Sequence, residues 1–306
     1  MVPELRDGAL NLHLHLWGWP VAVYLFLGGL AAGLSIFASW AYLTGRRREL
    51  YPAVQQATML TPLIILAGLI VLWFDLGSKW TPFWLYLTLR VRSPMSWGAW
   101  ILLAILLTSS LAAIPALLST RARLRSWRLE RIGHWAGPRM RLMAWLNLFL
   151  GASLGLYTGV LLGAMVARPA LNSPILPLLF LASGLSAAAA VLLLVAPGGP
   201  AHHLLARSEI AVEVVELTLV GLYLIGLATS TAAGQAAAAS LTAGTFAWAF
   251  WPLVIGGGMV IPLGLGILET RTRRAALGLA RFTALLVLIG GLALRLVLVY
   301  AGQHGL

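Results

Sequence analysis

Residues 20–43 read PVAVYLFLGGLAAGLSIFASWAYL, followed directly by Thr44-Gly45-Arg46-Arg47-Arg48. The first run contains no charged residue, whereas the second carries three arginines. A helix rises ~1.5 Å per residue, so about 20 apolar residues cross a hydrocarbon layer ~30 Å thick. The pattern therefore predicts a membrane-spanning helix that ends at a basic connection.

The same pattern repeats along all 306 residues. Apolar residues make up 60% of the sequence and charged residues 10%, and the mean hydropathy is +0.90. These values predict an all-α integral membrane protein with about eight transmembrane helices. The predicted spans are 20–43, 56–74, 97–118, 142–166, 175–195, 211–232, 247–268 and 282–301. We expect two four-helix bundles, residues 1–170 and 171–306.

Basic residues are distributed unequally between the two sides of the membrane. Of the 21 lysines and arginines, 15 lie in connections that follow odd-numbered spans. Cytoplasmic connections keep lysine and arginine, so we expect both termini in the periplasm and the protein in a bacterial inner membrane. The net charge of +12 then reflects topology and contact with the lipid bilayer, and no nucleic-acid partner is expected. The 15 residues are Arg46, Arg47, Arg48, Arg121, Arg123, Arg125, Arg128, Arg131, Arg139, Arg141, Arg207, Arg271, Arg273, Arg274 and Arg281.

The composition also limits the redox chemistry of the protein. The sequence contains no cysteine, which excludes thiolate-bound iron–sulfur clusters and covalently attached c-type haem in this chain. The six histidines lie in predicted connections or at span ends, so a pair that ligates b-type haem at mid-membrane is not expected, and no metal site is predicted. Any electron transfer would therefore require a small diffusible carrier and a partner subunit.

Four ionisable residues lie within or at the edge of predicted spans: Asp75, Glu213, Glu216 and Arg295. An unpaired charge at mid-membrane costs roughly 2.5–3.5 kcal/mol even on the lenient insertion scale, so such residues are usually paired or functional. Glu213 and Glu216 are three residues apart and share one helix face. The alternatives for each residue are a functional role, an interhelical ion pair, or a span-end side chain that reaches the headgroups.

Five motifs occur in a fixed order along the sequence. They are Trp17-Gly-Trp-Pro20; Tyr24-Leu-Phe-Leu-Gly-Gly-Leu-Ala-Ala-Gly33; Trp73-Phe-Asp-Leu-Gly77 with Arg92-Ser-Pro-Met-Ser-Trp-Gly-Ala-Trp100; Tyr157-Thr-Gly-Val-Leu-Leu-Gly163 with Ala167-Arg-Pro169 and Asn172-Ser-Pro174; and Leu294-Arg-Leu-Val-Leu-Val-Tyr-Ala-Gly-Gln303. Over residues 17–303 the sequence resembles the NrfD/polysulfide reductase membrane-subunit family.

The resemblance implies a role in a respiratory complex. Members of that family are quinone-interacting membrane anchors of periplasm-facing oxidoreductases, with a molybdopterin catalytic subunit and a ferredoxin-like iron–sulfur subunit on the periplasmic face. The expected cofactor is menaquinone or ubiquinone, with no haem or iron–sulfur cluster in this chain. A passive membrane anchor without a quinone site is an alternative.

The predicted topology brings several motif residues to the outer side of the membrane. A quinone needs hydrogen-bond donors at its carbonyls and a proton acceptor within an apolar cleft. Tyr24 and Tyr157 can donate, Asp75 can accept, and Arg168 or Arg295 can hold Asp75 ionised. The tyrosines could instead be interfacial anchors. Tyr24 stands where a relative carries a quinone-contacting histidine, and whether His15, about two and a half turns outward, takes that role stays open.

Glu213 and Glu216 lie on the opposite, cytoplasmic side. Two carboxyl groups one helical turn apart in an apolar environment repel each other, which suits a proton path from the cytoplasm. Alternatively, they pair with Arg207 or Arg281, or form the coupling site of a secondary transporter. The sequence does not identify the terminal substrate.

Overall fold

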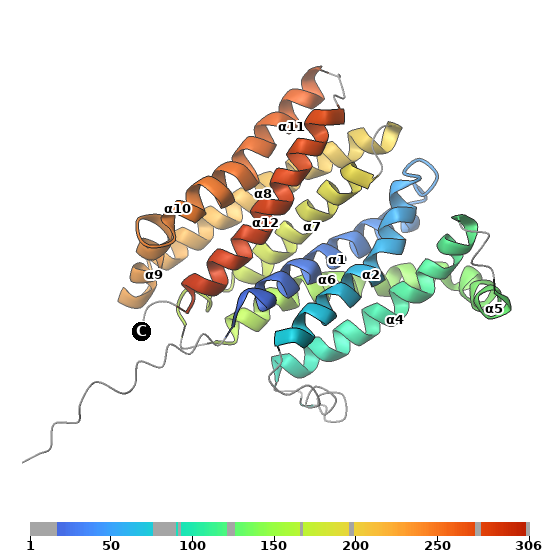
Figure 1. Ribbon diagram of the computed structural model, residues 1–306, viewed down its shortest axis with the longest axis horizontal. Helices are drawn as coiled ribbons and strands as arrows, with labels where there is room; N and C mark the ends of the chain where they lie inside the picture. Colours follow the sequence, from blue (N-terminus) through green and yellow to red (C-terminus); the bar gives the residue numbers. More distant parts are fainter. Residues whose placement is uncertain are drawn as a thin grey trace, which may run out of the picture.

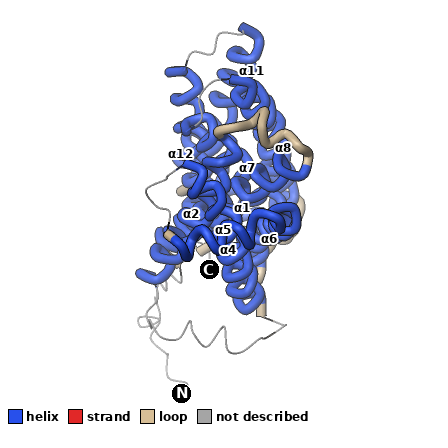
Figure 2. The backbone as a smooth tube through the Cα atoms, turned by 90° about the vertical axis from the view of Figure 1, so that its right-hand side faces the viewer, coloured by secondary structure: helices blue, strands red, loops and turns tan. Residues whose placement is uncertain are grey.

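The computed structural model describes residues 17–75, 90, 93–120, 126–165, 168–195, 199–272 and 277–303. Throughout these ranges the secondary structure is helical (Figures 1 and 2). The helices are α1 (Trp19–Leu43), α2 (Ala53–Asp75), α4 (Pro94–Thr120), α5 (Trp127–Ala136), η2 (Gly137–Arg139), α6 (Met140–Gly163), α7 (Leu176–Val195), α8 (Gly199–Ala228), α9 (Ala232–Thr242), α10 (Ala247–Ala249), η3 (Phe250–Val260), α11 (Ile261–Thr272) and α12 (Leu277–Ala301).

Eight of the described segments are long and apolar enough to cross a membrane, as the sequence predicts. The predicted bounds differ from these segments by up to 15 residues, most at the start of the fourth, which was predicted at 142–166 and begins at Trp127 because it includes α5 and η2. The sixth span, predicted at 211–232, begins at Ala201 within α8, and the seventh, predicted to end at residue 268, continues to Thr270. Charged residues near these ends suggested connections. In the structure several of them lie on a buried helix face, where they do not mark the edge of the span.

The seventh span is not a regular α-helix. Its segment η3, Phe250–Val260, is a π-helix, and the Ile261 amide donates a hydrogen bond to the Gly256 carbonyl five residues earlier. Pro252 and three consecutive glycines, Gly256 to Gly258, lie in this segment. Proline lacks an amide donor and glycine is conformationally permissive, so both weaken the regular α-helical pattern here.

The two central helices, α1 and α7, pack at very short range. Gly33 of α1 lies against the backbone of Gly184 in α7, and Gly184 in turn lies against the Gly29 carbonyl. Any side chain at these positions would meet backbone, so only glycine permits this approach. Around this pair, α1 also packs on α2 and α6, and α7 on α8 and α12. The N-terminal spans lie on one side of the bundle and the C-terminal spans on the other (Figure 1).

One end of the bundle carries the α1–α2 connection, α5 and the end of α11 (Figure 1). We call it the inner end because it bears the basic connections. Helix α5 is amphipathic; Ser126 caps it by accepting a hydrogen bond from the Leu129 amide, and Trp127 and Trp135 are exposed. Arg139 stacks 4.6 Å from the centroid of Trp135. This arrangement suits a helix at the headgroup level.

The start of α1 and the end of α12 meet at the opposite end, which we call the outer end. The Trp17 amide donates to Gln303 Oε1 over 3.0 Å, and Gln303 Nε2 donates to the Trp17 carbonyl over 2.8 Å. Arg168, which follows α6, donates to the Gln303 carbonyl over 3.0 Å. These bonds join three segments that are far apart in the sequence.

Candidate functional site

Tyr157 of α6 lies across Gly98 of α4 near the outer end. A Cβ atom at Gly98 would fall on the phenol ring of Tyr157, so the glycine of the Ser96-Trp-Gly-Ala-Trp100 motif provides the space for this ring. The Tyr157 side chain is 7% exposed, and its hydroxyl makes no hydrogen bond to another described residue. By contrast, the buried Tyr223 hydroxyl donates to the Ala170 carbonyl over 2.6 Å.

Tyr24 lies in the first turns of α1 and is also buried. Its ring approaches Gly68 of α2, and it belongs to the same apolar core cluster as Tyr157. Asp75 is the last residue of α2, but its side chain is outside the described part of the structure. His15 also lies outside the described residues. Both predicted tyrosine donors thus lie at the outer end, Tyr24 of α1 facing α2 and Tyr157 of α6 facing α4.

Arg295 lies deep in the bundle and is 0% exposed. Its Nη1 donates to Ser183 Oγ and to the Gly291 carbonyl, both over 2.8 Å, and Nη2 donates to the Phe180 carbonyl over 3.3 Å. The guanidinium also lies 5.1 Å from the Phe180 ring centroid. A Cβ atom at Gly29 would meet Nη2, so the glycine pair of α1 makes room for this charge.

The described contacts of Arg295 are with α1, α7, α8 and α12, and none is with Tyr157. Glu216 of α8 lies within electrostatic range of Ser183 and Arg295, although no salt bridge joins Glu216 to Arg295 in the described residues. Arg295 therefore lies near Glu216, one of the two residues predicted for a proton path. Its predicted role beside Asp75 stays a prediction.

Glu213 and Glu216 are 1% and 4% exposed. Arg207 and Arg281 lie on exposed surfaces, and neither forms a salt bridge with these glutamates in the described ranges. The described residues therefore give no support to pairing of the two glutamates with Arg207 or Arg281. That pairing assumed that the closest basic residues in the sequence share the buried face.

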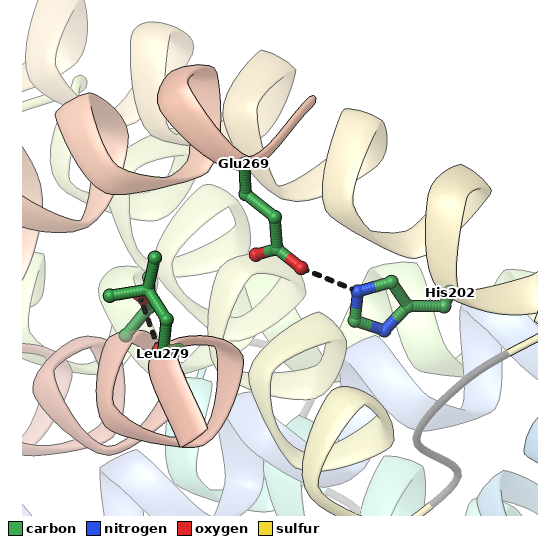
Figure 3. A network of polar contacts seen from close by, with 4 residues as sticks. His202, Glu269 and Leu279 are labelled. Atoms are coloured by element: carbon green, nitrogen blue, oxygen red, sulfur yellow. Dashed lines mark hydrogen bonds and ion pairs between the residues drawn. The ribbon is translucent and has the colours of Figure 1, made fainter. Parts of the chain in front are cut away.

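Three further buried groups at the inner end were missed by the sequence analysis: His202, Glu209 and Glu269. His202 Nε2 lies 2.7 Å from Glu269 Oε1, which links α8 to α11 (Figure 3). Glu269 acts electrostatically on Glu209, and Glu209 on Glu213. A heptad pattern could have found two of them, because His202, Ala206, Glu209, Glu213 and Glu216 are separated alternately by four and three residues.

A cavity of about 220 Å³ lies between α1, α2, α4 and α6 at the inner end. Its wall is formed largely by hydroxyl and amide side chains, and among the described residues that line it Arg47 is the only basic one and none is acidic. Asn147 lies in this wall, accepting a hydrogen bond from Thr108 over 2.6 Å. The cavity is at the opposite end of these helices from Tyr24 and Tyr157.

Comparison with known proteins identifies the relatives of this protein. The family described as "Polysulphide reductase, NrfD" matches residues 10–306. The C subunit of the polysulfide reductase of Wolinella succinogenes is 34% identical over 305 residues, covering 94% of each protein. Protein NrfD of Escherichia coli is 33% identical over 323 residues, covering 97% of this protein and 98% of the relative. A Protein NrfD homolog of Haemophilus influenzae is 29% identical over 305 residues. With its eight apolar helices, this chain belongs to the NrfD polysulphide reductase family of multi-pass membrane subunits.

Proposed function

We propose that the protein is the quinone-interacting subunit of a periplasm-facing respiratory oxidoreductase in the bacterial inner membrane. It would exchange electrons between menaquinone or ubiquinone and an iron–sulfur subunit docked at the outer end, through which a molybdopterin subunit is reached. Family membership supports the membrane-subunit role. The observation that carries the quinone site is the hydroxyl of Tyr157, which belongs to a largely buried side chain and has no hydrogen-bond partner among the described residues.

The quinone headgroup would lie between the outer parts of α1, α2, α4 and α6. Tyr157 would donate a hydrogen bond to one carbonyl and Tyr24 to the other, while the apolar core around them would accept the ring and part of the isoprenoid tail. Asp75 at the end of α2 would take up quinol protons, with Arg168 close to the same end of the bundle. His15 is the remaining candidate for a carbonyl ligand.

The Tyr157→Phe variant tests this site. It keeps the ring over Gly98 and removes only the hydroxyl, so one hydrogen bond of ~1 kcal/mol should be lost and quinone affinity should fall about fivefold. Affinity can be measured by titrating the purified protein with a short-chain quinone and following the fluorescence of its 13 tryptophans. Tyr42→Phe, at the inner end of α1, is the matched control. Equal affinity of both variants and the unaltered protein would remove Tyr157 from the site.

We also propose that both termini face the periplasm and that residues 1–170 and 171–306 form two four-helix halves. Packing among α1, α2, α4 and α6, and among α7, α8, α11 and α12, supports this division. Contacts of α7 with α1 and α6 would join the halves.

The orientation can be tested with single cysteines, since the natural sequence contains none. Arg90→Cys at the outer end should react with a membrane-impermeant thiol reagent in spheroplasts, whereas Arg139→Cys at the inner end should react only after the membrane is broken. Both arginines are exposed, so accessibility within the protein does not distinguish them. The reverse labelling pattern would show that the outer end faces the cytoplasm. It would contradict both the proposed orientation and the proposed periplasmic position of the iron–sulfur subunit.

A further inference from the structure

The inner part of α8 carries a buried polar stripe. His202, Glu209, Glu213 and Glu216 are each at most 5% exposed and lie on one helix face. At ~1.5 Å per residue they span roughly 21 Å along the helix axis, about two thirds of a ~30 Å hydrocarbon layer. The next buried positions on this face are Val220, Tyr223 and Leu227, so the carboxyl groups are confined to the inner two thirds.

Several atoms of this stripe lack hydrogen-bond partners. Oε1 of Glu209, Oε1 of Glu213 and Nδ1 of His202 are fully buried without one in the described part of the protein. A buried polar atom normally has a partner, because its absence costs free energy comparable to that of a lost hydrogen bond. These atoms therefore need hydrogen-bond partners other than the neighbouring side chains, such as protons on the carboxyl groups or water molecules.

The charges along the stripe do not cancel. Arg295 acts on Glu216, but no cationic side chain pairs with Glu209 or Glu213 in the described ranges. Several carboxylates without counter-ions would be too costly in an apolar bundle, whereas carboxyl groups that carry protons would not. A structural role for Arg295 would require only Glu216 and leaves Glu209 and Glu213 unexplained.

The carboxyl groups are arranged in sequence along the helix and not around one point. Glu269 acts electrostatically on Glu209, and both Glu209 and Glu216 act on Glu213, which lies between them on the helix. Within the described residues, no three acidic or histidine side chains converge as they would around a metal ion. A line of single groups suits stepwise transfer better than it suits binding of one cation.

The two ends of the line have different surroundings. At the inner end, His202 meets Glu269 (Figure 3), and its ring lies 6.1 Å from that of His203, which is exposed. At the other end, Ser183 accepts a hydrogen bond from Arg295, Glu216 lies within electrostatic range of both residues, and the rings of Phe26 and Phe180 lie around the guanidinium. The line therefore comes close to the exposed His203 at the inner end and ends at Arg295 inside the bundle.

We propose that His202, Glu269, Glu209, Glu213 and Glu216 form an inner-side proton conduit that ends at Ser183 and Arg295. In each step an O–H or N–H bond of one group breaks as the neighbouring group, directly or through a water molecule, gains the proton, and no electron is transferred. The inference deepens the proposed function and rests on it for the use of the protons: quinone chemistry confined to the outer end moves no charge across the membrane, and this conduit would supply an inward-facing route.

Proton entry can be measured without quinone chemistry. The full-length protein would be reconstituted in vesicles of phosphatidylcholine and phosphatidylglycerol that enclose a pH-sensitive dye, and a potassium diffusion potential would drive protons. The unaltered protein should acidify the lumen under a potential of the correct sign. Glu213→Gln and, separately, Glu209→Gln should reduce this rate to that of protein-free vesicles. Glu49→Gln, an exposed acid at the inner end, should leave it unchanged.

Quinone affinity, measured by tryptophan fluorescence in the same preparations, separates this proposal from the quinone site. Loss of proton entry with unchanged quinone affinity supports the conduit. Proton entry that survives both substitutions, or that the unaltered protein lacks, overturns it whatever the quinone result. Entry of radioactive sodium in place of protons also overturns it, in favour of a cation transporter.

A second measurement uses the unaltered protein and so does not depend on the folding of variants. Dicyclohexylcarbodiimide enters apolar regions and reacts with carboxyl groups that carry a proton. Peptide mass spectrometry should find the adduct on Glu209 or Glu213 and not on Glu49, and the modified protein should no longer conduct protons. An adduct found only on exposed acids would contradict the proposal.

Discussion

Arg295→Met is expected to destabilise the protein by about 3–5 kcal/mol, because it removes a fully buried cation together with the electrostatic compensation that this cation gives Glu216. The guanidinium that is lost donates three hydrogen bonds, to Ser183, Gly291 and Phe180. Glu216 would lose the nearby cation and would either stay charged in an apolar bundle or take up a proton, and both cost free energy relative to the natural protein. The free energy of unfolding in mixed detergent micelles, followed by tryptophan fluorescence, measures the effect.

Two companion variants make the Arg295 result specific. The double variant Arg295→Met with Glu216→Gln should recover a large part of the loss, because a neutral amide replaces the unpaired carboxylate. Arg281→Met, on the exposed side of the same helix, should change stability by only about 0.5 kcal/mol. If Arg295→Met proves as stable as the natural protein and loses only quinone affinity, Arg295 belongs to the quinone pocket and not to the α7–α8–α12 junction.

Gly184→Ala should also cause a large loss of stability, about 1–3 kcal/mol or more. The added Cβ would meet the carbonyl oxygen and the α-carbon of Gly29. Backbone atoms, unlike those of a side chain, cannot rotate away, so α1 and α7 would have to separate along their whole contact. Because Gly29 also borders the guanidinium of Arg295, the separation would disturb that junction too.

Gly221→Ala is the matched control, with the opposite expected sign. A Cβ there has no neighbour within 4 Å, and alanine is roughly 0.5–1 kcal/mol more favourable than glycine inside a helix. Thermal midpoints of the two purified variants in one detergent compare them directly. Equal stabilities would show that the α1–α7 distance is not limited by Gly184.

The number of spans was predictable because the hydrocarbon thickness demands long apolar helices whatever their packing. The polar stripe of α8 was only half predictable. Glu213 and Glu216 stand within an apolar run, whereas Glu209 and His202 have Arg207 and His203 as neighbours, and charged neighbours usually mark the end of a span. The choice depends on which face of α8 is buried, and that is set by its packing on α7 and α11.

Contacts between distant motifs were not predictable from the motifs themselves. Tyr157 and Gly98 were both expected near the outer side, but only the packing of α4 on α6 shows that one provides space for the other. The π-helical segment was equally hidden, because an uncharged span carries little periodic signal from which a change of helical type could be inferred. Side chains beyond η3 therefore face directions that a single helical period does not predict.

The mutual hydrogen bonds of Trp17 and Gln303 have a mechanical consequence. A polypeptide pulled out of a membrane from one end usually unravels one helical hairpin at a time, beginning with the hairpin under load. Here the first and last spans are fastened to each other at the outer end and also pack together within the bundle. A force applied to either terminus is therefore borne by the first and the last span together. These two spans, which would otherwise be the easiest to extract, hold each other in place.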